Sequence, residues 1–217
     1  MNLLQYCGNI SSLSQNTSSA SNSQKDSSIY ADNAIFDSKT GAQNLGTAVF
    51  KDDKLIGELN AIETLCMSIL KNDVKSFLVT IPNPEKSDEY IDIEMHQFNS
   101  IKIKVDIING SPYIKINGKF SGRILSADEN NNYLNSDLLN SVSNSTNDYL
   151  KSKLLSYLYK TSKNFKSDIN NFGNYALSSF LTTKDFEKFN WKENYKNAVF
   201  EVSIDSDIKS SLLLTKT

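Results

Sequence analysis

Three consecutive runs of alternating apolar and polar residues dominate the middle of this 217-residue chain. They span residues 90–98, 101–108 and 113–124, and Asn109-Gly110 between the last two is a strong two-residue hairpin signal. Successive side chains of a strand point to opposite faces, so each run buries one side and wets the other. The runs therefore predict an antiparallel meander with one buried face, whose core residues are Ile91, Ile93, Met95, Ile101, Ile103, Val105, Ile107, Ile114, Ile116 and Phe120.

A long helix is predicted to follow, over about residues 134–169, because its apolar residues recur with a 3.6-residue period. Leu154 and Leu158 are expected to pack on the sheet through Ile93, Val105 and Ile116. Phe172-Gly173 is expected to break this helix, and two short helices are expected over 174–181 and 184–189. Trp191 then precedes an alternating strand over 198–204, which the tail from Ser210 extends. The fold class is therefore α+β, a mostly antiparallel sheet packed against one long helix and several short helices.

Before the meander, residues 46–59 predict a short hairpin that leads into a helix. Asp52-Asp53 supplies turn chemistry between two strand-forming stretches. Asn60 is a good helix cap, and Glu63 three residues later completes a capping box at the start of a helix over 60–71. A further strand over 74–81 is expected to end at the prolines that follow it.

The chain divides by composition near residue 45. Residues 1–44 are rich in Ser and Asn and contain few residues able to bury area, so they are expected to be a largely disordered segment or the remnant of a preceding domain. Residues 45–217 are periodic and are expected to form one compact domain.

Charge and hydropathy exclude several classes of function. The net charge is −2 and Arg123 is the only arginine, which gives no electrostatic basis for binding nucleic acid. No apolar run reaches the length of a membrane span. The first ten residues lack the basic start of a signal peptide, and the residues before Cys7 do not fit a lipidation site. The Lys-, Asn- and Ile-rich composition suggests a low-GC bacterium.

No grouping of side chains predicts catalysis or metal binding. His96 has no metal-ligand partners nearby in sequence and is expected to be a solvated strand residue. Asp92 and Glu94 are expected to form cross-strand ion pairs with Lys102 and Lys104 rather than an acid–base pair. We therefore expect no catalytic residue, no cofactor-binding residue and no metal site.

Three further features of the sequence have both a chemical and a structural explanation. Asp128, Asn130 and Asn132 have the spacing of a calcium loop, but Tyr133 stands where such a loop requires glycine. Cys66 reads as a small buried hydrophobe, and a disulfide to Cys7 is not favoured. A lysine cluster in the second half of the long helix suits a solvated face or, as the alternative, an anionic membrane surface; its members are Lys151, Lys153, Lys160, Lys163 and Lys166.

The chain from Gly46 onward resembles the C-terminal domain of the GerAC-like family, the lipoprotein C subunits of bacterial spore germinant receptors. The resemblance rests on the block from Gly46 to Leu59, with Gly57 and the pair Glu63-Thr64 that follows. It also rests on the order of elements, on the block from Lys166 to Gly173 with its Asp and Phe-Gly, and on Trp191 with the final strand. The sequence departs from the family at Leu65-Cys66, where Arg-Gly is common.

The resemblance implies a non-enzymatic component of a spore germinant receptor that acts in nutrient-triggered germination. Its implied partners are the A and B membrane subunits, and its implied location is the outer face of the spore inner membrane, reached through those partners. Because the stretch before Gly46 is short and carries no anchor, a truncated or fragmentary copy, or an internal start, is expected. The alternative is a secreted or surface binding domain with a Ser/Asn-rich stalk; a hydrolase with an unrecognised site is a third hypothesis.

Overall fold

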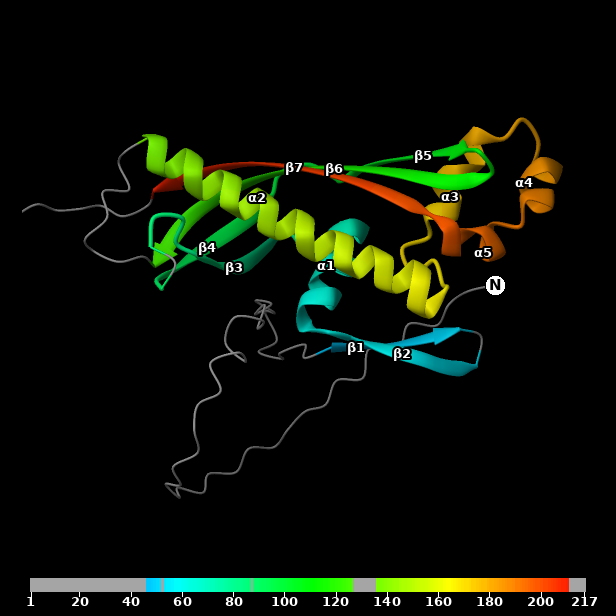
Figure 1. Ribbon diagram of the computed structural model, residues 1–217, viewed down its shortest axis with the longest axis horizontal. Coiled ribbons are helices and arrows are strands. Elements are labelled where there is room, and N and C mark those ends of the chain that lie inside the picture. The colour runs from blue at the N-terminus through cyan, green and yellow to red at the C-terminus, as the bar shows by residue number, and fades with distance from the viewer. Residues whose placement is uncertain (1–45, 52, 87, 127–135, 211–217) are drawn as a thin grey trace, which may run out of the picture.

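The computed structural model describes residues 46–51, 53–86, 88–126 and 136–210 (Figure 1). The strands are β1 (Gly46–Lys51), β2 (Lys54–Asn60), β3 (Ser76–Pro82), β4 (Tyr90–Gln97), β5 (Lys102–Ile108), β6 (Ser111–Ser126) and β7 (Val199–Ser210). The helices are α1 (Ala61–Lys71), α2 (Ser136–Tyr159), α3 (Phe172–Ala176), α4 (Thr183–Phe189) and α5 (Trp191–Asn194). A π-helix (Lys160–Phe165) continues α2, and 3-10 turns cover Leu177–Ser179 and Tyr195–Asn197. The predicted α+β class, a mostly antiparallel sheet against one long and several short helices, is confirmed.

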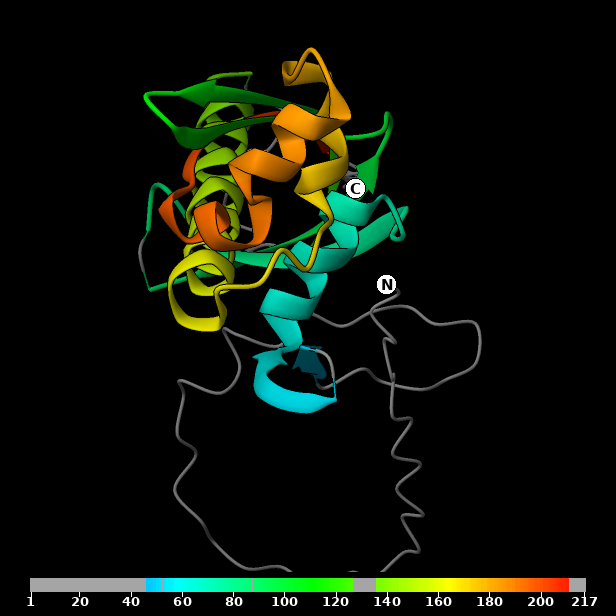
Figure 2. The ribbon, with the colours of Figure 1, turned by 90° about the vertical axis from the view of Figure 1, so that its right-hand side faces the viewer.

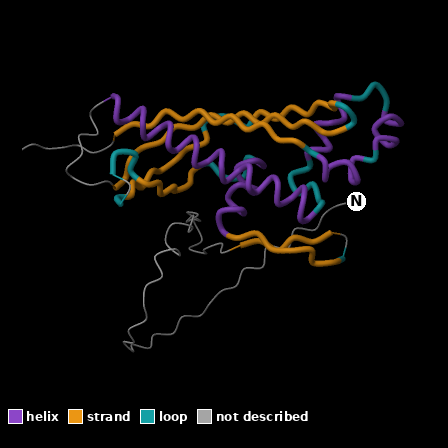
Figure 3. Tube along the Cα trace, in the orientation of Figure 1, coloured by secondary structure: helices purple, strands orange, loops and turns teal. Residues whose placement is uncertain are grey.

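Strand β6 is the spine of the main sheet. Its sixteen residues pair along one edge with β5 and then with β4, and along the other edge with β7. β4 and β5 therefore lie end to end beside β6, while β3 pairs with the far side of β4. Figure 3 shows the strands of this long sheet in orange, with the long helix in purple running across them.

The predicted three-strand meander is wrong in its order, because β4 does not pair with β5. Asn109 and Gly110, with φ of 50° and 75°, make the predicted tight turn, and β5 returns into β6 there. Between β4 and β5, residues 98–101 lie opposite only residues 118–119 of β6, so this segment bulges out of the sheet. β4 pairs with β6 on one side of the bulge and β5 pairs with β6 on the other side. Alternation identifies strands and their buried faces, but it does not identify their neighbours.

The side chain of Asn72 holds this bulge in place. Asn72 ends α1 in the left-handed conformation at φ 60°. Its Oδ1 accepts hydrogen bonds from the Ile101 N–H at 2.7 Å and from Gln97 Nε2 at 2.6 Å. One residue thus ends a helix and fixes the point where β4 passes into β5.

Strand β7 is parallel to β6, in register from Tyr113 opposite Val199 to Ile124 opposite Ser210. A parallel pair needs a long crossover, and α2 with the helices after it supplies that connection. α2 lies diagonally across the sheet and against β7 (Figure 1). Its buried residues are Leu138, Val142, Thr146, Leu150, Leu154, Tyr157 and Leu158. With Ile93, Val105 and Ile116 of the sheet, the two predicted leucines belong to one buried core.

The predicted boundaries are wrong at the end of the long helix. The α-helix stops at Tyr159 and becomes a π-helix that ends at Phe165 and is capped by Lys166, a residue with φ 48°. Phe172-Gly173, expected to break the helix, instead begins α3. Phe172 is 0 % exposed, so this block is an anchored helix start rather than a break.

The hairpin of β1 and β2 forms a separate two-stranded sheet, as the sequence predicts. The predicted capping box is also present: the Glu63 N–H donates to Asn60 Oδ1 at 2.8 Å, and the Asn60 N–H donates to Glu63 Oε2 at 2.9 Å. α1 leads from this hairpin toward the main sheet, and the hairpin lies at the opposite end of α1 (Figure 2). No helix in the described ranges is long and apolar enough to cross a bilayer.

Leu154→Ala should lower the free energy of unfolding by about 2–5 kcal/mol, because truncation leaves a cavity at a well-packed site. Leu154 is 1 % exposed, whereas Leu181 is 100 % exposed and offers a matched control. Leu181→Ala should change stability by less than about 0.5 kcal/mol. Urea unfolding followed by circular dichroism measures both, and equally small changes would show that the buried face of α2 is assigned wrongly.

Candidate functional site

The side chains first considered for acid–base or metal chemistry lie on the open face of the sheet and do not converge. His96 Nε2 lies 3.5 Å from Glu94 Oε2, and the Arg123 guanidinium donates to the same oxygen. That hydrogen bond is the main reason that the pKa of Glu94 lies below its usual range. Asp92 accepts a hydrogen bond from Thr80 Oγ1 at 2.7 Å. These are surface contacts between strands.

The ion pairs expected from Asp92 and Glu94 to Lys102 and Lys104 are wrong. β6, not β5, lies beside β4, so Arg123 takes the position opposite Glu94. Lys104 Nζ instead lies 3.0 Å from Asp106 on its own strand. This error follows directly from the error in strand order.

The remaining candidate ligands give no metal centre. In the part of the chain that is described, no group of three or more His, Cys, Asp or Glu side chains is placed to hold a metal ion. The calcium-like spacing of Asp128, Asn130 and Asn132 lies outside the described residues, as does Cys7. Cys66 is a free, buried thiol. Burial raises its pKa to about 12, which leaves almost no reactive thiolate near neutral pH.

Two lysines of the long-helix cluster make contacts with segments outside the helix. Lys160 Nζ bonds Glu63 Oε2 at 2.6 Å and the Glu58 carbonyl at 3.0 Å. Lys163 Nζ donates to the Lys196 carbonyl at 2.7 Å. Both residues belong to the π-helix, which therefore contacts segments distant in sequence on two sides.

The hairpin is fastened to the body by three contacts that involve Gly57, Glu63 and Thr64. A Cβ atom added at Gly57 would overlap the ring of Phe165 in the π-helix, so only glycine allows this approach. Glu63, already in the capping box, forms the ion pair with Lys160. Thr64 Oγ1 donates to Thr47 Oγ1 of β1 at 3.2 Å in a buried position.

A second group of contacts fastens the C-terminal lobe, defined here as residues 172–197. Asp168 Oδ1 accepts from the Phe172 N–H at 2.9 Å, and Oδ2 accepts from the Gly173 N–H at 2.8 Å and Trp191 Nε1 at 2.9 Å. A Cβ added at Gly173 would lie 2.9 Å from Trp191 Nε1. Burial raises the pKa of Asp168, although the hydrogen bonds from Gly173, Phe172 and Trp191 oppose that rise.

Buried polar contacts connect these two groups through the π-helix. Tyr157 donates its hydroxyl to Asn170 Oδ1 at 2.5 Å, and Asn170 Nδ2 donates to the Met67 carbonyl of α1 at 3.2 Å. Thr161 Oγ1 lies 2.9 Å from the Tyr195 hydroxyl. Burial raises the pKa of both tyrosines, so both hydroxyl groups remain protonated. π-helical turns are rare and often mark functional sites, and this one joins the hairpin, α1 and the C-terminal lobe.

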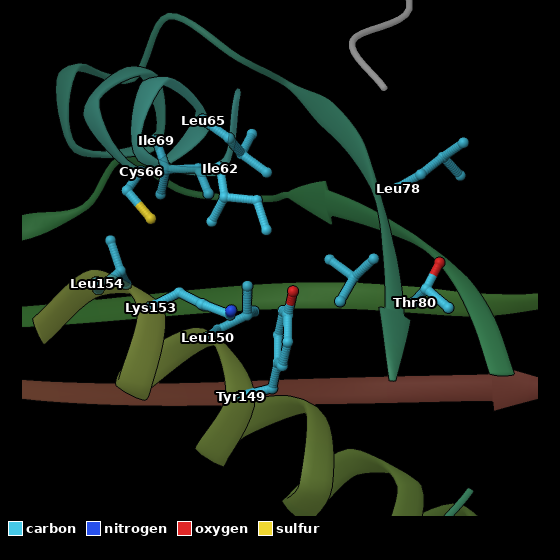
Figure 4. A pocket seen from close by; sticks show the side chains of 11 residues that line it. Ile62, Leu65, Cys66, Ile69, Leu78, Thr80, Tyr149, Leu150, Lys153 and Leu154 are labelled. Carbon is cyan, nitrogen blue, oxygen red and sulfur yellow. The ribbon is translucent and has the colours of Figure 1, made fainter. Parts of the chain in front are cut away.

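A small apolar groove opens between α1, α2 and β3 (Figure 4). Its walls come from Ile62 and Leu65 of α1 and from Leu150 and Leu154 of α2. Lys153 directs its amine toward the groove and lies 5.3 Å above the ring of Tyr149. Among the described residues that line the groove, Lys153 is the one with a charged side chain.

The comparison with protein families matches residues 45–211 to the family described as spore germination B3/GerAC like, C-terminal. The chain belongs to this family. The match begins one residue before β1 and includes the hairpin, the main sheet and the C-terminal lobe. The expected resemblance is therefore confirmed.

Among solved structures, the chain is similar to one titled as the crystal structure of the GerBC protein. The two share 21 % sequence identity with a TM-score of 0.65, and the alignment covers 83 % of this chain. It covers 58 % of the GerBC chain, so this chain matches little more than half of that protein. At this identity the likeness concerns the fold. No curated protein matches the chain.

The resemblance drew attention to Gly57, Glu63, Asp168 and Trp191, but sequence reasoning missed what they contact. It did not pair Lys160 with Glu63, and it did not bring Phe165 against Gly57. The π-helix gave no signal, because its apolar spacing continues that of α2.

Gly57→Ala should lower stability by about 1–3 kcal/mol, because the new methyl group overlaps the Phe165 ring. As a single substitution, Phe165→Leu should also lower the free energy of unfolding. In the double variant, Gly57→Ala should lower it by less than in the wild-type background, because the ring that the methyl group overlaps is gone. Gly110→Ala has no neighbour within 4 Å but a φ of 75°, so it controls for backbone strain without contact to the π-helix. Additive effects of the first two substitutions would contradict the contact.

Trp191→Phe should lower stability by about 1–2 kcal/mol at neutral pH, because charged Asp168 loses one of its donors. The hydrogen bond from Trp191 stabilises the charged form of the Asp168 carboxyl. The loss of stability caused by Trp191→Phe should therefore become smaller as pH falls through the pKa of Asp168. Phe189→Leu trims the same aromatic cluster without touching the carboxyl, and its deficit should not depend on this titration. Denaturant unfolding by circular dichroism across pH measures both, and a deficit for Trp191→Phe that is constant with pH would contradict the assignment.

Proposed function

We propose that this chain is a non-enzymatic component of a spore germinant receptor, of the C-subunit type, that acts in nutrient-triggered germination through protein–protein contacts. The observation that carries the proposal is the family match over residues 45–211, supported by the fold likeness to GerBC. The proposed partners are the A and B membrane subunits of the receptor. The proposed place of action is the outer face of the spore inner membrane.

The internal chemistry of the domain supports a role in binding rather than catalysis. The polar side chains grouped around the π-helix are committed to each other: Asp168 accepts three hydrogen bonds, and Lys160 contacts both Glu63 and a carbonyl. A catalytic group needs to reach a substrate, whereas these groups hold segments together. They give the hairpin and the C-terminal lobe fixed positions on one body, as a recognition surface requires.

The alternative is a secreted or surface binding domain with a Ser/Asn-rich stalk and no part in germination. It shares the same fold and the same lack of a catalytic grouping among the described residues. The two functions differ in the partner, so the experiment has to identify the partner directly.

Co-expression of the tagged chain with the A and B subunits of its host, followed by membrane fractionation and affinity purification, should recover the chain with both subunits. Deletion of its gene should slow the nutrient response of spores while leaving germination by a non-nutrient trigger unchanged. Thr64→Val with Gly57→Ala, which loosens the hairpin, is the structural control. A chain that stays in the soluble fraction, together with spores of unchanged nutrient response, would overturn the proposal and favour the alternative.

A further inference from the structure

The tripeptide Ile-Asn-Gly occurs twice in the chain, at residues 108–110 and 116–118. In such a pair the backbone nitrogen of the glycine can attack the side-chain amide of the asparagine, because glycine has no Cβ to hinder the approach. The reaction also requires the backbone of the pair to change its conformation. The two sites have the same local sequence, so only their surroundings in the fold can make one react and protect the other.

The first pair, Asn109-Gly110, is the two-residue loop between β5 and β6. Strand pairing ends at Ile108 opposite Ser111, so neither loop residue belongs to the ladder. Both loop residues are exposed, and a Cβ atom added at Gly110 would have no neighbour within 4 Å. The reacting amide is therefore open to water, and the loop can change its conformation without displacing another segment.

The second pair, Asn117-Gly118, lies in the middle of β6 and is held by its neighbours. Asn117 pairs with Lys102 of β5 and with Ser203 of β7, and Gly118 pairs with Ile204 of β7. Gly118 is buried, and a Cβ atom added there would lie within 3.1 Å of three side chains. A reaction at this pair requires the sheet to open at its central strand, and such openings are rare.

We propose that Asn109 is a site of spontaneous covalent modification in the folded chain, and that Asn117 is protected from it. The Gly110 nitrogen gives its proton to hydroxide and attacks Cγ of Asn109. A bond forms between Cγ and this nitrogen, and the bond from Cγ to Nδ2 breaks; the leaving group takes a proton from water and departs as ammonia. Water then opens the succinimide ring. Hydrolysis of the new bond gives aspartate, and hydrolysis of the original peptide bond gives isoaspartate.

The two products differ in their effect on the hairpin. Asp-Gly forms the same tight turn as Asn-Gly, in which both loop residues have positive φ, here 50° and 75°. Isoaspartate carries the main chain through its side-chain carbon, so the loop becomes one backbone atom longer and no longer fits the strand pairing beside it. The C-terminal lobe rests on β5, where Ser179 Oγ donates to the Val105 carbonyl (Figure 1). We therefore expect isoaspartate, and not aspartate, to loosen the end of the hairpin that supports this lobe.

The test is long incubation of the folded chain at neutral and mildly alkaline pH, followed by peptide mapping. Trypsin cuts after Lys104, Lys115 and Lys119, so the two asparagines fall in separate peptides. The peptide with Asn109 should become heavier by one mass unit and separate into two products, at a rate that rises with pH because the nitrogen must lose its proton. The peptide with Asn117 should react at least about ten-fold more slowly, since the sheet has to open first.

Incubation in concentrated guanidinium chloride is the matched control, because it removes the fold and keeps both sequences. Both asparagines should then react at similar rates. An Asn109 peptide that reacts in the denaturant but stays unchanged in the folded chain would show that the turn itself blocks the reaction, and would overturn the proposal. Equal rates at Asn109 and Asn117 in the folded chain would also overturn it, because the fold would then give no protection.

Two variants test the site and its consequence. Asn109→Gly removes the reacting amide and keeps a residue that accepts positive φ, so its peptide should gain no mass and its unfolding midpoint should not change. Asn109→Asp reproduces one product and should also keep the midpoint. Wild-type chain enriched in isoaspartate by chromatography should unfold at a lower denaturant concentration than Asn109→Asp, and equal midpoints would contradict the loosening of the hairpin.

This inference goes beyond the proposed function and does not rest on it. Every measurement uses the chain alone, whereas the receptor role is tested by recovery with the A and B subunits and by the nutrient response of spores. Failure of the receptor role and failure of this modification site are therefore distinguishable.

Discussion

The whole sheet depends on the pairing of β6 along both of its edges. One strand of sixteen residues bonds β5 and β4 on one side and the parallel β7 on the other. Ile114, Ile116 and Ile124 are at most 1 % exposed, so this strand also supplies the centre of the core. Because β6 is long, each of its edges needs either one long partner strand or two shorter strands placed end to end. The bulge held by Asn72 lets β4 and β5 lie end to end along one edge. Without β6, no two of the other main-sheet strands except β3 and β4 would be paired.

The π-helix makes a comparable connection among the parts outside the sheet. Phe165 contacts Gly57 of the hairpin, Lys160 binds Glu63 at the start of α1, and Thr161 meets Tyr195 of the C-terminal lobe. An isolated two-stranded hairpin is at best marginally stable in water, so β1 and β2 need these contacts to persist. The resemblance to the family rests on glycine, acidic and aromatic residues. In the structure these residues permit or make contacts between segments that are distant in the sequence.

Local chemistry was readable from the sequence, and long-range pairing was not. Asn60 and Glu63 predicted a capping box, and Asn109-Gly110 predicted a turn, because each signal lies within a few residues. The order of β4, β6 and β5 was missed because alternation carries no information about which strands pair. The ion pair of Lys160 with Glu63 joins residues 97 positions apart, and no local pattern predicts such a pair. The candidate groove was missed for the same reason, since three separate elements form it.

The treatment of the sheet edges links the fold to its proposed role. β7 lies against α2, and the Val105 carbonyl of β5 accepts a hydrogen bond from Ser179 of the C-terminal lobe. β3 has no such cover among the described residues, although its sequence is the most apolar of the three edges. An uncovered apolar edge favours self-association and aggregation, so a chain that keeps one gains only if a partner uses it. The polar contacts around the π-helix hold the parts of the domain together, and among the described residues β3 is the sheet edge that neither a helix nor the C-terminal lobe covers.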